Sequence, residues 1–302
     1  MALPSSGSIS LGQVNTELGV SATATRSLND TTTRNLFGVA SGAISMSNGY
    51  GKANQFAFTI SSNQTNVNLA TLATNAGWNG SSKVVATINS GVLISSNSTG
   101  TAALTIPPSF PGGVELINNG TIVGMGGNGG AGGNADAWYS YSNPGSPGAS
   151  GGTALSVSAS TTITNNGTLA GGGGGGGGGS AWDAYVYDGY SGFYMWKDGA
   201  GGGGGGGRSS YAANSSGGSG GYARKFNRTG GAGGTGYSSA AGGGGGGNNA
   251  AAGGGGGTWG GSGTAGGNYS KSGGAAGGGG AAVSGNSYVT WAVTGTRMGG
   301  LV

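Results

Sequence analysis

The sequence predicts a mostly irregular and β protein. It begins with a short helical N-terminal docking segment, continues as a small β-rich domain and ends in a polyglycine II helix bundle with aromatic loops. Of its 80 glycines, 66 lie in residues 121–302, many in unbroken runs. Trp and Tyr separate these runs, and charged residues make up only 6% of the chain. A disordered low-complexity chain is the alternative, but such chains are usually more charged and poor in aromatics.

Residues 1–53 are expected to form short helices that attach the chain to a partner. Ser10 and Gln13 fit a capping box, and Gly19 stands where a helix would end. Asp30 is the expected cap of a second helix. A unit this small has little core of its own, so it docks either on another protein or on the next domain. The candidate docking residues are apolar: Leu11, Val14, Leu18, Leu36 and Phe37.

Residues 54–120 are predicted to form a β-rich connector domain. Alternating or continuous apolar stretches at 56–60, 83–88, 92–94 and 102–106 are typical of strands. Residues 68–76 suit a short helix that stops at Gly77. Pro107 and Pro108 interrupt the pattern near the end of this region.

An internal repeat crosses the boundary between this domain and the glycine-rich part. Residues 117–122 and 164–169 each place Asn-Asn-Gly-Thr between apolar residues, and each leads into a glycine run. Asn-Gly favours a tight turn, so each copy is expected to be strand, turn and strand. Repeats of this period predict stacked units that share a core. Residues 283–293 are expected to close the array as a last β element.

The glycine-rich part, residues 121–302, is expected to form a bundle of threefold helices. The longest runs are Gly171–Gly179, Gly201–Gly207, Gly242–Gly247 and Gly253–Gly257. Nine glycines in a polyproline-II-type helix span about 28 Å. Such helices pack side by side when each buried N–H and C=O finds a neighbouring helix. Pure glycine therefore predicts an interior helix, and runs broken by Ala, Ser or Asn predict outer ones. A collagen-like structure is excluded, because the Gly-X-Y period is not kept.

The spacers between glycine runs are the candidate binding loops. They are placed at 134–150, 180–198, 208–229 and 258–272, and 16 of the 24 aromatic residues lie within residues 134–272. Loops rich in Tyr, Trp, Ser, Gly and Asn are typical of protein binding surfaces. Packing of the aromatics as a cap on the bundle is the alternative. The candidate receptor-binding residues are Trp138, Tyr139, Tyr141, Trp182, Tyr185, Tyr187, Tyr190, Phe193, Tyr194, Trp196, Arg224, Lys225, Arg228, Trp259 and Tyr269.

Two of these loops carry opposite charge. Residues 181–198 contain three aspartates, and residues 208–228 contain four cations. The basic loop could meet an anionic lipopolysaccharide or an acidic protein, or the two loops could pair with each other. Four cations are too few to favour nucleic acid, so no nucleic-acid partner is expected.

Composition argues against catalysis, cofactors and metals. The chain has no cysteine and no histidine, which removes thiolate sites and the commonest general base and metal ligand. Asp183 and Asp188 could act as a carboxylate pair, but loop carboxylates are more often simply solvated. The first ten residues do not resemble a secretory signal. No stretch approaches the roughly 18–20 apolar residues of a membrane helix, so no membrane insertion is expected.

The opening of the chain resembles that of tail and tail-fibre proteins of tailed phages. The resemblance rests on Ser8-Ile-Ser-Leu-Gly-Gln-Val-Asn-Thr-Glu-Leu18, Ser27-Leu-Asn-Asp30, Gly42-Ala-Ile-Ser-Met46 and Tyr50-Gly-Lys52. The remainder is similar to the glycine-rich tail-fibre adhesins of T-even-like phages. In that family an N-terminal domain attaches to the fibre, polyglycine II helices are sandwiched, and loops between them choose the receptor. This N-terminus differs from the long β-helical attachment domain of the T-even type.

The resemblance implies an adhesin in the distal tail of a virion. Residues 1–53 would bind a tail-fibre or baseplate protein, and the loops would bind a bacterial outer-membrane protein or lipopolysaccharide. Two alternatives stay open. A purely structural tail subunit would use the loops for subunit contacts, and an ice-binding protein would use a flat glycine face, although long aromatic spacers do not suit that role.

Overall fold

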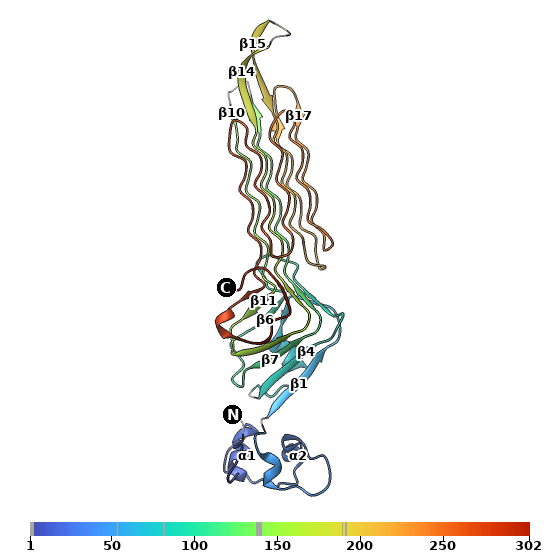
Figure 1. Ribbon diagram of the computed structural model, residues 1–302, viewed down its shortest axis with the longest axis vertical. Coiled ribbons are helices and arrows are strands. Elements are labelled where there is room, and N and C mark those ends of the chain that lie inside the picture. The colour runs from blue at the N-terminus through green and yellow to red at the C-terminus, as the bar shows by residue number, and fades with distance from the viewer. Residues whose placement is uncertain (1–2, 53, 81, 137–140, 189, 191) are drawn as a thin grey trace.

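The computed structural model describes all residues except 1–2, 53, 81, 137–140, 189 and 191. The molecule is elongated, and three parts follow one another along its length (Figure 1). We call them the helical module, the β-helix and the glycine bundle. The described residues contain three short α-helices, and strands or extended segments make up most of the rest. The prediction of a mostly β and irregular protein is therefore confirmed.

The helical module contains α1 (Leu11–Glu17), α2 (Thr31–Phe37) and a 3-10 turn at Met46–Gly49. The capping box is present: Gln13 N–H donates to the Ser10 hydroxyl at 3.1 Å, and Ser10 N–H donates to Gln13 Oε1 at 2.8 Å. Gly38 ends α2 with a φ of 72°. Asp30 precedes α2 but makes no capping bond, because its carboxylate accepts the Ser27 N–H at 3.0 Å instead.

The module has a small core of its own, which corrects part of the docking prediction. Val14, Leu36 and Phe37 are buried in this core together with Leu3 and Ile9. Side chains so deeply buried hold the module together and offer little surface to a partner, although Leu36 lines a pocket beside β1 (Gln55–Ile60). Leu11 and Leu18 are half-buried, so they remain candidates for a docking contact.

The β-helix is built from three parallel sheets, and each turn of the chain adds one strand to each sheet, except that the last turn adds none to the third. The first sheet contains β1 (Gln55–Ile60), β4 (Lys83–Ile88), β7 (Val114–Asn118), β12 (Thr161–Asn165) and β19 (Val289–Val293). The second contains β2 (Gln64–Thr65), β5 (Leu93–Ser95), β8 (Thr121–Val123), β13 (Thr168–Ala170) and β20 (Thr296–Met298). The third contains β3 (Val67–Asn68), β6 (Leu104–Ile106), β11 (Leu155–Val157) and β18 (Val283–Ser284), and α3 (Leu69–Asn75) follows β3.

Alternating side chains of these strands fill a single apolar core. In β4, Val84, Ala86 and Ile88 are fully buried while the intervening residues are half-buried. Leu116 of β7 and Ile163 of β12 continue the same layer from turn to turn. The predicted helix at 68–76 is α3, and the Asn68 side chain caps it by accepting the N–H groups of the first turn.

The two copies of the Asn-Asn-Gly-Thr repeat lie directly on each other. Asn118 Nδ2 donates to Asn165 Oδ1 at 2.7 Å, and Asn166 Nδ2 donates to Asn119 Oδ1 at 2.9 Å. Both pairs are separated by 47 residues, the period of the repeat. Asn165 then donates to the Thr294 carbonyl in the next turn at 2.9 Å. The prediction of stacked units that share a core is confirmed.

Replacing Asn165 by alanine should destabilise the β-helix by about 2–3 kcal/mol, because it leaves buried hydrogen-bonding groups without partners. Asn165 is fully buried and bridges two turns of the β-helix. Asn166→Ala is the matched control. It removes a similar asparagine pair that is exposed to solvent, so a loss of about 0.5 kcal/mol is expected. Denaturant unfolding of the two variants compares these losses, and equal values would contradict the buried bridge.

The β-rich part extends well beyond residue 120, where the sequence placed its end. Strands from residues 155–170 and 283–298 complete the three sheets. The glycine bundle is therefore two long insertions, one between β8 and β11 and one between β13 and β18. The predicted closing element is confirmed, since β18 and β19 form the last strands of the third and first sheets.

The glycine bundle consists of extended segments that run alternately away from the β-helix and back towards it (Figure 1). They are residues 124–133, 144–152, 171–179, 200–208, 215–221, 230–236, 242–247, 251–257, 261–267 and 273–280. Almost all of their hydrogen bonds join one segment to another. The main chain therefore satisfies its own polar groups across the bundle, as a buried backbone requires.

Hydrogen bonds along segment 171–179 repeat every third residue. Gly172, Gly175 and Gly178 donate to residues 152, 149 and 146, at 2.8 to 2.9 Å. In this way its N–H groups reach segments 144–152, 200–208 and 261–267, and its carbonyls accept from segments 124–133, 251–257 and 273–280. Segment 171–179 thus has a neighbour on every side. A Cβ at any of its glycines would overlap a neighbouring carbonyl oxygen, which explains the unbroken run.

The rule that pure glycine marks an interior segment holds for 171–179 and for 201–207, but it fails for 242–247. A Cβ added at Gly243 or Gly246 would meet nothing within 4 Å, and both residues are exposed. Segment 242–247 therefore lies on the outside of the bundle, and part of its glycine content is not demanded by packing.

Candidate functional site

The candidate site is the end of the glycine bundle farthest from the β-helix, which we call the tip (Figure 1). An antiparallel hairpin of β14 (Trp182–Asp188) and β15 (Phe193–Gly199) projects from it. A small sheet lies beside the hairpin, with the order β10 (Tyr141–Ser142), β9 (Ala135–Asp136), β16 (Tyr222–Ala223) and β17 (Arg228–Thr229). Segments from three distant stretches of sequence therefore meet at the tip.

Four buried alanines form the junction between the bundle and the tip: Ala135, Ala181, Ala200 and Ala223. They come from three loops, since Ala181 and Ala200 flank the same hairpin. The glycine segments that lead into the tip lie too close together for larger side chains. Where these segments begin to diverge, there is room only for a methyl group. The alanines hold the bases of the loops together without a large apolar core.

The acidic hairpin and the basic loop contact each other through Asp198. This side chain is completely buried, and its Oδ2 accepts the Lys225 N–H at 2.9 Å. The Asp198 carbonyl also accepts a hydrogen bond from Arg228 Nη1 at 3.2 Å. Nearby, Arg224 Nη1 lies 3.3 Å from Asp136 Oδ2. These contacts join the loops. The two to Asp198 use the Lys225 backbone N–H and the Asp198 carbonyl, and the ion pair of Arg224 is with Asp136 in the loop 134–143, so both interpretations of the charges remain predictions.

The tip presents exposed aromatic rings from several loops. Tyr185 on β14 is 57% exposed, and Tyr190 at the end of the hairpin is fully exposed. Tyr141 and Tyr269 are at least half exposed. Tyr269 also packs edge-on against Trp182, with ring centroids 5.4 Å apart. Some aromatics therefore pack, as the capping alternative expects, while others expose much of their surface to solvent.

Several candidate residues lie outside what the structure describes. Trp138 and Tyr139 fall in the undescribed residues 137–140. For Tyr187, Phe193, Tyr194 and Trp196 only the backbone is described: Tyr187 is opposite Tyr194, and Trp196 is opposite Tyr185. All four belong to the hairpin, so their positions agree with a role at the tip.

Trp259 is not at the tip, although the spacer 258–272 that contains it was predicted as one binding loop. It lies in a turn beside the β-helix, where its Nε1 donates to the Ser209 carbonyl at 2.9 Å. Arg208 is at the same end, with its guanidinium carbon 3.8 Å from the centre of the Trp259 ring. The basic residues at 208–228 therefore belong to two sites, because segment 215–221 carries the chain from one end of the bundle to the other.

The first binding loop is shorter than the predicted spacer 134–150. Residues 144–152 form a segment of the bundle: Ser146 N–H donates to Ala131 at 2.8 Å, and Gly148 N–H donates to Ala275 at 2.9 Å. Glycine recurs there at every third residue, at 145, 148 and 151, where a Cβ would overlap segment 171–179, and Gly152 at the end of the segment faces the Thr99 backbone instead. The loop at the tip is therefore 134–143.

Two exposed aromatics at the tip were not singled out from the sequence. Tyr222 is 43% exposed and its hydroxyl donates to Asn227 Oδ1 at 2.9 Å. Phe226 is 39% exposed, and the Arg228 guanidinium lies 4.9 Å from its ring centroid. Both lie within the predicted basic spacer. Their closeness in sequence to Arg224 and Arg228 could have identified them as candidate binding residues.

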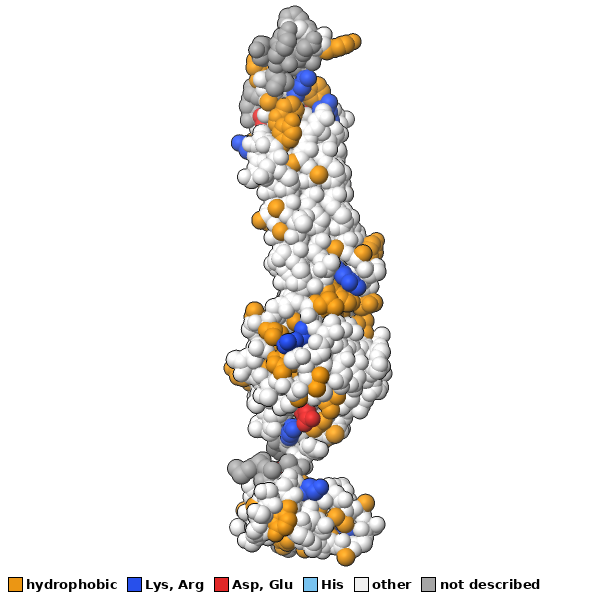
Figure 2. All heavy atoms as spheres, in the orientation of Figure 1, with side chains coloured by type: hydrophobic (Ala, Val, Ile, Leu, Met, Phe, Trp, Pro, Cys, Tyr) orange, Lys and Arg blue, Asp and Glu red, His pale blue; other side chains and the backbone are white. Residues whose placement is uncertain are grey.

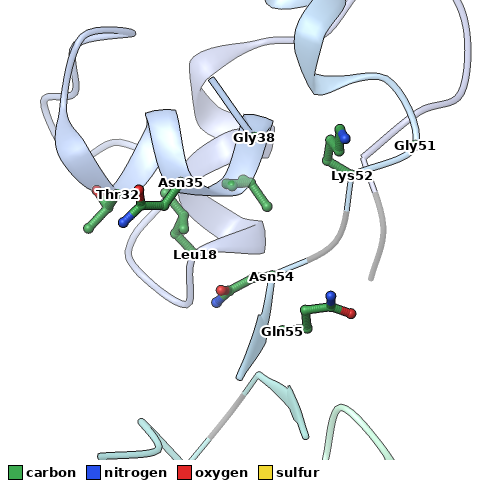
Figure 3. Close-up of a pocket in the computed structure, with 9 residues that line it drawn as sticks. Leu18, Thr32, Asn35, Gly38, Gly51, Lys52, Asn54 and Gln55 are labelled. Carbon is green, nitrogen blue, oxygen red and sulfur yellow. The ribbon is translucent and has the colours of Figure 1, made fainter. Parts of the chain in front are cut away.

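The described part of the chain contains no group of three His, Cys, Asp or Glu side chains that could hold a metal ion. Among the described residues, no helix is long and apolar enough to cross a membrane. A pocket of about 630 Å³ lies at the other end of the molecule, between the helical module and β1 (Figure 3). Its lining includes Leu18, Asn35, Lys52 and Gln55.

Loops with exposed side chains at one end of a regular scaffold are a common arrangement in binding proteins. The chain belongs to the phage tail fibre adhesin Gp38 family, whose model matches residues 55–302. It is thus a bacteriophage tail-fibre adhesin of the distal tail of the virion. Among solved structures, the gp37-gp38 adhesin tip complex of the bacteriophage S16 long tail fiber is similar to it. The identity is 22% and the TM-score 0.48, over 89% of this chain and 91% of that chain. Comparison with curated proteins finds no relative.

Proposed function

We propose that the tip binds the bacterial receptor, an outer-membrane protein or lipopolysaccharide. The observation that carries this proposal is the convergence of three loops with exposed Tyr141, Tyr185, Tyr190 and Tyr269 at one end of the molecule. Tyrosine offers a large contact area, few rotatable bonds and a polar group, which suits a rigid binding surface. The small alanine junction and the Asp198 contacts support loops that are ordered before they bind.

The glycine segments in this proposal are polyglycine II helices packed in a hexagonal array. Three features of segment 171–179 support it: extended backbone, hydrogen bonds that repeat every third residue, and six neighbouring segments. Such an array has no side chains to rearrange, so it resists bending. Its function is to hold the tip at a fixed distance from the β-helix, about 28 Å for nine residues.

The helical module is the proposed attachment site for a tail-fibre or baseplate protein. It lies at the end of the molecule opposite the tip (Figure 1). The pocket beside β1 exposes Leu18 and several polar groups to such a partner. Residues 1–53 and the parts that follow them would then serve as attachment segment, connector and display bundle. No catalytic step is part of the proposed function.

Adsorption measurements with tyrosine variants test the tip. Tyr185→Ser combined with Tyr190→Ser removes two exposed rings, and virions carrying it should adsorb at least about tenfold more slowly. Tyr288→Ser is the matched control, because Tyr288 is also about half exposed but lies in the β-helix. It should adsorb normally.

Competition separates the adhesin from a purely structural subunit. Purified adhesin should block adsorption of wild-type virions, and the double variant should block it less well. Normal adsorption by the double variant, together with an adhesin that coassembles but never competes, would instead favour the structural role. Thermal hysteresis of the purified protein would favour the ice-binding alternative.

A further inference from the structure

A second group of aromatic and basic side chains lies where the glycine bundle meets the β-helix. We call it the shelf and define it by Arg208, Tyr211, Tyr237 and Trp259. These residues belong to three turns at the lower end of the bundle, joined by the Ser209 N–H bond to the Tyr237 carbonyl at 3.1 Å. Figure 2 shows hydrophobic and basic side chains gathered at this level, separate from those at the tip. The proposed function makes no use of them.

Arg208 is a fixed cation. Its guanidinium stacks on the Trp259 ring at 3.8 Å, and its Nε donates to the Ser238 carbonyl at 2.8 Å. Within the described residues no carboxylate forms an ion pair with Arg208, whereas Arg224 at the tip lies 3.3 Å from Asp136. A half-buried arginine that is held in place but lacks a counter-charge is suited to a planar anion, which it can bind through two parallel hydrogen bonds.

The aromatic rings beside Arg208 are exposed. Tyr211 is 57% exposed, and its ring centroid lies 6.2 Å from that of Trp259. Tyr237 is 51% exposed. Neither ring is needed to fill a core, so both are available to cover the apolar face of a ligand while the hydroxyl groups remain in water.

A groove of about 320 Å³ continues from Tyr211 onto the β-helix. It is lined by Asn63, Gly91, Val92, Leu93 and Thr121. Asn63 Oδ1 accepts the Leu93 N–H at 2.9 Å, and its amide NH₂ is a donor for a ligand hydroxyl. The volume is at the lower end for small-ligand sites, which fits one or two sugar rings better than a drug-sized apolar molecule.

We propose that the shelf binds an anionic saccharide, a ligand that the proposed function does not require. The carboxylate or phosphate of the sugar pairs with Arg208, a ring face lies on Tyr211, and a hydroxyl accepts from Asn63. A single cation suits one acidic sugar and is too little charge for nucleic acid. The tip and the shelf are separated by the length of a bundle segment, about 28 Å. The adhesin would therefore contact the glycan layer with its side while its tip reaches the receptor.

Titration of the full-length protein with defined oligosaccharides tests the shelf. Trigalacturonic acid is the anionic probe, and maltotriose is the neutral probe of the same length. Saturable binding of trigalacturonic acid is expected, with at least a tenfold weaker affinity for maltotriose. Arg208→Gln and Tyr211→Ser should each weaken binding of the acidic probe at least tenfold, while Tyr288→Ser, which lies in neither the tip nor the shelf, should leave it unchanged. A phosphorylated lipopolysaccharide core oligosaccharide, titrated in parallel, distinguishes phosphate from carboxylate as the preferred anion.

Three outcomes would overturn the proposal: no binding of either anionic probe, equal binding of maltotriose, or wild-type affinity in both shelf variants. Arg208 also contacts Trp259, so its replacement could disturb the turn. Tyr211→Ser avoids this difficulty because its ring is largely in solvent. Normal adsorption by the tip double variant would reject the tip and retain the shelf. Unchanged saccharide binding in both shelf variants would reject the shelf and retain the tip, so the two proposals fail separately.

Discussion

Gly205→Ala should lower the free energy of unfolding by about 3 kcal/mol or more, at the upper end of overpacking effects. Gly205 lies in segment 200–208, inside the bundle, where its N–H donates to Gly254 and its carbonyl accepts from Gly176, both at 2.8 Å. An added Cβ would overlap the carbonyl oxygen of Gly242. Backbone cannot rotate away as a side chain can, so the methyl group must force two segments apart and break the hydrogen bonds between them.

Gly243→Ala is the matched control, since it makes the same change in a neighbouring segment. Nothing lies within 4 Å of the added methyl group, and Gly243 does not have a positive φ. The change should therefore be neutral or stabilise by about 0.5 kcal/mol, because alanine has fewer unfolded conformations than glycine. Thermal unfolding and hydrogen exchange at Gly171–Gly179 compare the two variants. Equal stability, or rapid exchange in the wild-type protein, would contradict the packed array.

The sequence anticipated the interior of the bundle better than its surface. An interior segment needs glycine at every position, which appears as a run such as 171–179. An outer segment needs glycine only on the face that touches the bundle, so Pro144, Ser146 and Pro147 hid segment 144–152 within an apparent loop. Segment 242–247 shows the opposite error, because its glycines suggested an interior position that the structure does not give it.

Which loops share an end of the bundle depends on the direction of each segment. Successive segments alternate, so counting from residue 171 places the turn at Trp259 beside the β-helix and the turn at Tyr269 at the tip. The sequence contained this information, but the aromatic residues were grouped by composition alone. Direction also explains why Arg208 and Arg224 belong to different sites.

The β-helix was the hardest part to predict, although its elements were visible. Strands such as β2 and β8 have only two or three residues, too short for an apolar pattern. Their pairing joins residues far apart in sequence, as in β13 with β20. The repeated Asn-Asn-Gly-Thr was the one local sign of stacking, and it identified the correct pair of turns. The capping box at Ser10, by contrast, needs only contacts three residues apart, and it was predicted correctly.

Asp198→Ala should reduce adsorption about 10–100-fold while leaving the melting temperature of the whole protein nearly unchanged. The carboxylate is buried and accepts the Lys225 N–H at 2.9 Å, so it joins the hairpin to the basic loop. A hydrogen bond to a charged group contributes about 1.5–3 kcal/mol, and every 1.4 kcal/mol corresponds to a factor of ten in affinity. The lost free energy disorders the loops of the tip. It does not affect the bundle, because the bundle is held together by its own backbone hydrogen bonds.

Asp183→Ala is the control for this change. Asp183 lies opposite Asp198 across the hairpin, and no hydrogen bond of its side chain is found among the described residues. Its replacement alters charge at the same place without separating the loops, so adsorption should change less than about threefold. Equal effects of the two variants would show that charge, not loop order, governs adsorption. A large fall in adsorption for Asp198→Ala alone would mean that receptor affinity depends on loops that are ordered before contact. The entropy cost of ordering such loops is offset when the protein folds, so binding does not have to offset it.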